Sequence, residues 1–314
     1  MHWRTKGMIQ KALVYVPAGQ HLHFLLQRTA GGLKNVAGEL DVKVDDWRIM
    51  VGHLRNAGVD LQGCRMMEIG SGWYPTLPFC LYLGGVGRVH TVDLNRHMKA
   101  GLTREAADLL GKYLELIAQA CGASHDDVLR RHRLLADRLT GIDVESATDG
   151  VIQYRAPGDA RRTNLPDHSV DVVFSNSVLE HVPGDAIEGM FREAMRILVP
   201  GGVMFHSVNC GDHYAYVDRT ISQLNYLQYS DNEWEKWNND FLYQNRLRAH
   251  AFVEMAERAG FALELNTAKP SERRLRELEK VRVHSQFAHL PPEKLCITSI
   301  DFIARKRGPA VARA

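Results

Sequence analysis

The chain has 314 residues, enough for one large α/β domain with insertions or for two small domains. Hydrophobic residues make up 45% and charged residues 24%, as in ordinary globular proteins, and a formal net charge of +2 gives no reason to expect a nucleic-acid partner. The five cysteines are scattered without a Cys-x-x-Cys pair, so we expect reduced thiols in a cytoplasmic protein rather than a zinc site or a disulfide framework.

Residues 1–42 are predicted to form a separate helical unit. Apolar residues recur at helical spacing from Trp3 to Val16, and Pro17 and Gly19 end that helix. The apolar stretch is too short for a signal peptide or a bilayer span. We expect the unit to pack on the main domain, with a lid over the substrate as the second interpretation. A basic helix on a membrane surface is a weaker third, because the stretch is short and only modestly basic.

Residues 43–310 are predicted to form the main domain, because helix and strand patterns alternate there as in a parallel sheet. Strands are predicted at 65–69, within 86–92, and at 152–155, 170–174, 203–208, 262–265 and 295–304. Helices are predicted around Trp47, at 185–198 and at 252–259. Residues 96–150 form an insertion with helices at 103–120 and 124–139, which either caps the active face or only widens the fold.

A glycine turn follows the first predicted strand, in the sequence Glu68-Ile69-Gly70-Ser71-Gly72. Glycines let the backbone pass close to a ligand, and the helix that follows offers free N–H groups to an anionic group. The third glycine of the dinucleotide fingerprint is missing after Gly72, which argues against NAD. Asp93 ends the second strand, where a carboxylate can accept both hydroxyls of a ribose; a helix N-cap is the alternative.

The densest pattern begins at Gly158-Asp159-Ala160, continues through Leu165-Pro166-Asp167 and Leu179-Glu180-His181, and ends at Pro200-Gly201-Gly202. This combination resembles the class I S-adenosylmethionine-dependent methyltransferases over about residues 60–305. The resemblance implies a Rossmann-like α/β fold with a seven-stranded sheet whose last strand is antiparallel, accompanied here by the helical N-terminal unit and helical insertions. It also implies S-adenosylmethionine as the cofactor.

The resemblance further implies roles for individual residues. Glu68, Gly70 and Gly72 would hold the methionine end of the cofactor, and Asp93 would bind its ribose. Ser71 and Leu94 belong to the same predicted site. Asp159 would hydrogen-bond the adenine amino group, and Ala160 would add a backbone contact. Ser175, Asn176 and His181 would lie near the sulfonium.

Candidate residues for the substrate side follow the fifth strand. His213, next to Asp212, is a candidate general base for a hydroxyl, with a loop-stabilising histidine as the alternative. Residues 212–250 are predicted to form a helical substrate cap in which Tyr243, Arg246 and Arg248 contact the substrate, because arginine binds anions bidentately; plain packing is the alternative. No set of carboxylates has the spacing for magnesium, and no metal site is predicted.

The predicted function is methyl transfer to a small molecule or a glycan intermediate, at a hydroxyl oxygen. The segment 243–248 loosely resembles methyltransferases of polysaccharide and natural-product gene clusters. Two alternatives stay open: an N- or C-methyltransferase of a natural product, and a protein that binds S-adenosylmethionine without transfer. An Asn-Pro-Pro-Tyr box and a basic patch are both missing from the sequence, which argues against nucleic-acid methylation.

Overall fold

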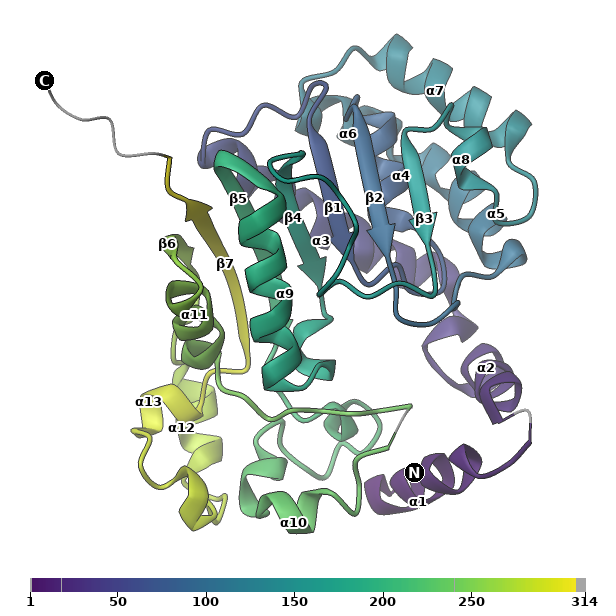
Figure 1. Ribbon diagram of the computed structural model, residues 1–314. Helices are drawn as coiled ribbons and strands as arrows, with labels where there is room; N and C mark the ends of the chain where they lie inside the picture. The colour runs from purple at the N-terminus through teal and green to yellow at the C-terminus, as the bar shows by residue number, and fades with distance from the viewer. Residues whose placement is uncertain (1, 18, 240, 309–314) are drawn as a thin grey trace, which may run out of the picture.

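The computed structural model describes residues 2–17, 19–239 and 241–308 (Figure 1). Seven strands form one sheet in the order β3-β2-β1-β4-β5-β7-β6, and β7 runs antiparallel to both of its neighbours. The strands are β1 (Arg65–Ile69), β2 (Arg88–Val92), β3 (Ile152–Arg155), β4 (Val170–Asn176), β5 (Leu198–Asn209), β6 (Phe261–Asn266) and β7 (Ser299–Lys306). The predicted Rossmann-like sheet with an antiparallel last strand is therefore confirmed.

Helices cover both faces of this sheet, which explains why β4 is an almost continuous apolar run. One face packs against α3 (Val36–Asn56), α4 (Thr76–Leu83), α5 (Ala100–Leu109), α6 (Leu114–Cys121), α7 (His125–Arg138) and α8 (Val144–Ala147). The other face packs against α9 (Gly184–Ile197) and α11 (Ala249–Arg258). Asp171, the polar residue in the β4 run, pairs with Arg65 of β1 at 2.7 Å.

The N-terminal unit contains two helices before α3 rather than one. Helix α1 (Trp3–Val14) ends ahead of Pro17, and α2 (Gly19–Ala30) begins where we expected only a stop signal. A short 3₁₀ turn, η1 (Gly32–Lys34), then leads into α3, which runs across positions 42 and 43. The boundary that we placed at residue 42 thus lies inside a helix, and the last two residues of the predicted main domain, 309–310, lie outside the described residues.

The insertion between β2 and β3 differs from its prediction in one respect. The helix expected over 103–120 is interrupted by a 3₁₀ turn, η2 (Leu110–Tyr113), between α5 and α6. Gly111 lies in this turn, where a Cβ would come within 3.3 Å of His132 on α7. The close approach of α7 favours a small residue there, and glycine also weakens a continuous helix.

The remaining segments gather near the carboxyl ends of the parallel strands, where Figure 1 also places α1 and α2. The described residues of the segment 212–250 are mostly irregular: they form η4 (His213–Tyr216), η5 (Asn225–Gln228), α10 (Asp231–Trp234) and the first two residues of α11, so most of the expected helical cap is not helical. Before β7 come α12 (Glu272–Leu278), η6 (Ser285–Phe287) and α13 (Pro292–Leu295). Helix α13 occupies the start of the strand that we predicted over 295–304.

All five cysteines are free and buried, as the sequence predicted for reduced thiols. Within the described ranges, each helix is either too short or too polar to cross a bilayer.

Candidate active site

The turn after β1 holds two glycines in the left-handed region of backbone space. Gly70 has φ +88° and Gly72 has φ +65°. A Cβ on Gly70 would lie 2.5 Å from a methyl carbon of Val178, so this position requires glycine for two separate reasons. A Cβ on Gly72 would meet no atom of the described residues within 4 Å. The backbone of the turn is therefore open to a ligand at Gly72.

Asp93 connects the end of β2 to this turn. Its Oδ2 accepts the Gly72 N–H at 3.0 Å, and its Oδ1 accepts the Asn95 N–H at 3.0 Å. The next helix begins only at Ala100, so Asp93 is not the helix N-cap that was the alternative to ribose binding. Each carboxylate oxygen can accept more than one hydrogen bond, so Asp93 can also receive a ligand hydroxyl. Leu94 beside it is 67% exposed.

Glu68, the second-last residue of β1, is buried with a small hydroxyl network. Thr91 of β2 donates a hydrogen bond to its carboxylate, and the Thr91 and Ser71 hydroxyls lie 2.5 Å apart. Burial raises the pKa of Glu68 to about 7, and the nearby Lys43 ammonium on α3 partly opposes this rise. Lys43 also lies 4.3 Å above the ring of Tyr74. The buried Glu68 carboxylate on β1 and the Lys43 ammonium on α3 thus both lie close to the glycine turn.

Asp159 lies in the loop after β3, where it forms a two-pronged ion pair with Arg161 at 2.8 Å. This pairing lowers the pKa of the Asp159 carboxyl group, so the group is ionised at neutral pH. Ala160 is buried beside it. The predicted contact of Asp159 with adenine therefore has to share this carboxylate with Arg161.

Ser175 and Asn176, at the end of β4, face opposite sides of the sheet. The fully buried Ser175 hydroxyl lies 2.7 Å from His206 Nδ1 on β5, so its side chain belongs to the core rather than to the strand end. A contact of Ser175 with the cofactor is left to its backbone. The Asn176 amide donates to Asp46 of α3 at 3.0 Å. Asn176 is thus fixed against the same helix that carries Lys43.

His181, in the turn after β4, comes together with His213, the second residue of the segment 212–250. Their ring centroids are 4.8 Å apart, and Glu180 Oε1 lies 3.9 Å from His213 Nε2. Burial lowers the pKa of His213 to about 3, aided by the positive charge of nearby groups, so His213 is neutral at pH 7 and a weaker base than we assumed. Its role as general base stays a prediction.

Asp212, which we counted with His213 and His181 among the catalytic candidates, has its side chain occupied by the loop itself. Its Oδ1 accepts the Tyr214 N–H at 2.9 Å, and its Oδ2 accepts the Asn225 side-chain amide at 2.8 Å. Asp212 therefore holds the loop together as the N-cap of η4, and neither oxygen is directed to the histidine.

The two arginines predicted to bind substrate are structural instead. Arg246 is 5% exposed and donates to the carbonyl oxygens of Tyr226 and Tyr229, at 3.0 and 2.6 Å. Arg248 is 2% exposed and donates to the carbonyls of Cys210 and Leu295, at 2.7 and 3.0 Å. The terminal nitrogens of both guanidinium groups donate to the chain itself, whereas Arg248 Nε is buried without a partner among the described residues, so the expected bidentate contact with a substrate anion is not supported. Tyr243 stays a candidate: its ring is partly exposed and its carbonyl accepts from His181 Nδ1 at 2.6 Å.

Sequence reasoning missed Lys43, Asp46 and Glu180. Lys43 and Asp46 precede Trp47 on the buried stretch of α3, and a charged residue next to a buried helix face was the only available signal. Glu180 stood in the Leu179-Glu180-His181 motif but received no role.

A cavity of about 980 Å³ separates the N-terminal helices from the edge formed by the glycine turn and the end of β2. Leu13 and His23 line one side, and Trp73, Leu94 and Lys99 line the other. Phe24 of α2 packs on Trp73, with ring centroids 5.3 Å apart. The volume lies in the range of about 300–1,000 Å³ that is typical of small-molecule sites.

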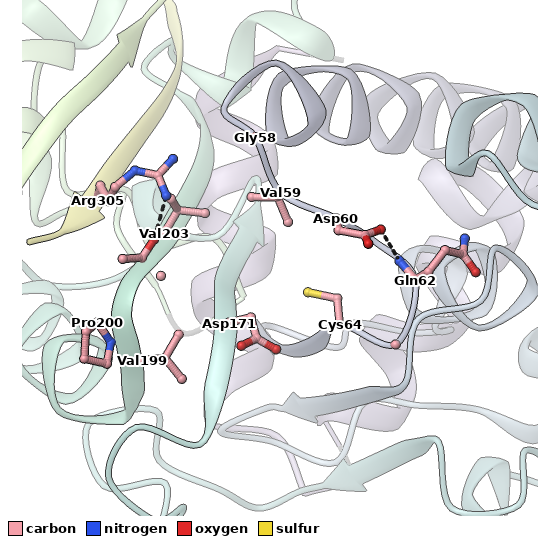
Figure 2. Close-up of a pocket in the computed structure, with 13 residues that line it drawn as sticks. Gly58, Val59, Asp60, Gln62, Cys64, Asp171, Val199, Pro200, Val203 and Arg305 are labelled. Carbon is pink, nitrogen blue, oxygen red and sulfur yellow. Dashed lines mark hydrogen bonds between the residues drawn. The ribbon is translucent and has the colours of Figure 1, made fainter. Parts of the chain in front are cut away.

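A second cavity, of about 370 Å³, lies near the amino ends of β1, β4 and β5 (Figure 2). Figure 2 shows Asp60, Asp171 and Arg305 on its wall. The candidate residues described above lie near the carboxyl ends of these strands, so this cavity is not part of the candidate site.

Comparisons with known proteins point to one enzyme class. Residues 120–206 match a family model described as a methyltransferase domain. A probable S-adenosylmethionine-dependent methyltransferase of Mycolicibacterium smegmatis is 29% identical over 136 residues, which cover 41% of this chain and 46% of that protein. The chain thus spans about half the length of this relative. A trans-aconitate 2-methyltransferase of Escherichia fergusonii is 25% identical over 186 residues, 56% of this chain and 69% of that protein.

Solved structures were also compared. An S-adenosylmethionine-dependent methyltransferase from Mesorhizobium loti superposes with a TM-score of 0.44 and 16% identity, covering 81% of this chain and 96% of that chain.

Proposed function

The chain carries a methyltransferase domain of the class I S-adenosylmethionine-dependent family, and from this premise we propose that it methylates a hydroxyl oxygen of a small polar molecule or a glycan intermediate. One observation carries the proposal: Glu68, the glycine turn and Asp93 converge at the carboxyl ends of β1 and β2, beside a cavity of about 980 Å³. Ligands of open α/β sheets bind at these strand ends.

The groups at this edge fit the parts of S-adenosylmethionine, which supplies an activated methyl group when bound. The buried Glu68 carboxylate suits the ammonium of the methionine end, and the Lys43 ammonium suits its carboxylate. Asp93 offers acceptor positions for the ribose hydroxyls, and the exposed Leu94 offers an apolar surface beside them. Asp159 lies in the loop after β3, where it would meet the adenine amino group.

The chain's own task in such a reaction is to align the two reactants and exclude water. The N-terminal helices suit this task because they bridge both sides of the candidate site. Phe24 packs on Trp73 of the glycine turn, and His23 stacks on Phe241 of the segment 212–250, with ring centroids 4.4 Å apart. The acceptor side is proposed to include Tyr243 and His213 of that segment together with His181, which contacts both of them.

The test is formation of S-adenosylhomocysteine by the purified protein with acceptor sets that carry hydroxyl, amine or acidic carbon groups. Mass spectrometry of the product then locates the added methyl group. We expect turnover with a hydroxyl acceptor and an O-methyl product. An N- or C-methyl product overturns the choice of acceptor atom. Binding of S-adenosylmethionine with no turnover on any set favours a protein that binds it without transfer.

A further inference from the structure

Three side chains that could bind a metal converge where the turn after β4 meets the start of the segment 212–250. Glu180 and His181 lie in the 3₁₀ turn η3 (Leu179–His181) after β4, and His213 begins η4 after β5. One ligand atom from each residue lies within 4.8 Å of the others. The two segments are 32 residues apart in sequence and meet because β4 and β5 are neighbouring parallel strands.

The Glu180 carboxylate is buried without a partner for either oxygen. The residue is 3% exposed, and among the described residues neither Oε1 nor Oε2 has a hydrogen-bond partner. His213 Nε2, 3.9 Å from Oε1, is likewise buried and unpartnered. Such orphaned groups are rare because each costs the desolvation energy of a polar atom. Three orphaned atoms that face one another are explained by a common ligand, and a cation satisfies them together.

The hydrogen bonds around the cluster orient it for a cation. His181 Nδ1 lies 2.6 Å from the Tyr243 carbonyl oxygen, so Nδ1 carries the proton and Nε2 keeps its lone pair. Metal-binding histidines show this arrangement, in which the other ring nitrogen donates to a carbonyl. The His213 backbone N–H donates to Gln244 Oε1 at 3.0 Å, and the Gln244 amide donates to the Gly211 carbonyl at 2.9 Å. Both histidines are therefore held in place from outside the cluster.

We propose that Glu180, His181 and His213 bind a divalent metal ion such as Zn²⁺. Two imidazoles and one carboxylate suit Zn²⁺, Fe²⁺ or Co²⁺, whereas Mg²⁺ and Ca²⁺ prefer oxygen ligands. A tetrahedral zinc ion holds its ligand atoms ~3.4 Å apart, so small rotamer changes close the present spacing. The proposed site departs from our expectation of no metal site, which considered only carboxylates with the spacing for magnesium.

Three protein ligands leave a fourth coordination position for a water molecule or a substrate oxygen. An acceptor hydroxyl bound there loses its proton to water more easily, which removes the need for His213 as a base. This catalytic role rests on the proposed function, whereas binding of the ion does not.

Equilibrium dialysis of the full chain against ZnCl₂, followed by elemental analysis, tests the site directly. We expect one zinc ion per chain. Glu180→Gln, His181→Ala and His213→Ala should each weaken zinc binding by at least about tenfold, since losing a ligand costs more than losing its hydrogen-bond partner. Co²⁺ bound to the wild-type protein should give the strong visible absorption of a tetrahedral ion.

A matched control is available in His125, whose Nε2 lies 3.9 Å from Glu115 Oε2 in an exposed pair. His125→Ala should leave zinc binding unchanged. Less than one stoichiometric ion in the wild-type protein overturns the site without reference to any variant, and so does equal binding by all variants. S-adenosylhomocysteine binding is measured on the same samples. If the wild-type protein does not bind S-adenosylhomocysteine, the result counts against the proposed function. If the wild-type protein binds S-adenosylhomocysteine but takes up no zinc, the result counts against the metal site alone.

Discussion

Asp93 holds the glycine turn in place and is also the proposed ligand of the ribose. It accepts hydrogen bonds from the backbone of Gly72 and Asn95 in addition to its proposed contact with ribose. We expect Asp93→Ala to weaken S-adenosylhomocysteine binding by about 1.5–3 kcal/mol, as for lost hydrogen bonds to a charged group. Isothermal titration calorimetry measures this change.

The control for Asp93 is Asp60→Ala. Asp60 Oδ1 accepts the Gln62 N–H at 3.0 Å, which is the same local contact as the one between Asp93 and the Asn95 N–H. Asp60 lies near the amino ends of the strands, away from the candidate site. Asp60→Ala should leave the binding constant unchanged. Equal affinity in the two variants removes Asp93 from the ligand site.

Glu68 makes the stability of the protein depend on pH. Because burial raises its pKa from 4.5 to about 7, the unfolded chain loses this proton at lower pH than the folded chain does. Its contribution to folding stability therefore falls as pH rises from about 4.5 to about 7, by up to about 3 kcal/mol at ~1.4 kcal/mol per pH unit. Lys43 on α3 and Asp93, the residue after β2, are the charged groups that act on it.

Glu68→Gln isolates this effect. The variant should gain stability relative to wild type as pH rises through this window, as measured by urea unfolding at several pH values. Glu145→Gln, at an exposed position on α8, serves as the control. A constant difference between Glu68→Gln and wild type from pH 4.5 to pH 8 contradicts the expectation.

The two arginines of the segment 212–250 show what residue type alone does not reveal. Their sequence context suggested anion binding, but the segment is irregular, so many of its buried carbonyl groups lack partners in helices or strands. Arg246 supplies donors for the Tyr226 and Tyr229 carbonyls of this segment, and Arg248 supplies them for the Cys210 and Leu295 carbonyls outside it. Asp93 and the glycine turn were easier to predict, because their positions follow from strand ends.

At the scale of elements, the parallel strands were predicted well because burial on both faces leaves a continuous apolar run, as in β4. The N-terminal helices were predicted less well. The apolar stripe of α1 suggested that Met8 and Ile9 are buried, yet they are 58% and 45% exposed. The buried residues of α1 include a glycine and a glutamine: they are Trp3, Gly7, Gln10 and Leu13. The surface on which the helix packs therefore determines which face is buried, more than the hydrophobicity of the helix does.

Trp3 anchors α1 on that surface. Its ring centroid lies 5.4 Å from that of Tyr214 and 5.0 Å from that of Trp237, and its backbone N–H donates to Asp218 Oδ2 at 3.0 Å. We expect Trp3→Ala to destabilise the docked N-terminal unit by about 3–5 kcal/mol, the usual cost of deleting a buried aromatic ring. Limited proteolysis should then cleave within residues 2–35 while the sheet stays protected. Met8→Ala, on the exposed side of the same helix, should leave the cleavage pattern of wild type, and resistance of Trp3→Ala to cleavage argues against this anchor.

At the scale of the whole molecule, the candidate site joins elements from most of the chain. Lys43 comes from α3, Glu68 from β1, Asp93 from the turn directly after β2, and Phe24 from the N-terminal unit. A ligand that bridges these elements binds the folded state and not the unfolded one, so it stabilises the whole domain. At a concentration of 100 Kd the gain is about 2.7 kcal/mol. Because such a gain is worth about 2–4 °C per kcal/mol in a large domain, the Tm should rise by about 5–10 °C.

Differential scanning calorimetry with S-adenosylhomocysteine measures this shift, and NAD is the matched negative ligand. NAD shares the adenosine half but lacks the methionine end, and the third glycine of the dinucleotide fingerprint is missing here, since position 75 is proline. We expect no shift with NAD and a reduced shift with S-adenosylhomocysteine in Asp93→Ala. Equal shifts with the two ligands show that the site recognises adenosine alone, and the assignment of Glu68 and Lys43 to the methionine end then fails. An unchanged Tm at saturating S-adenosylhomocysteine contradicts the donor site as a whole.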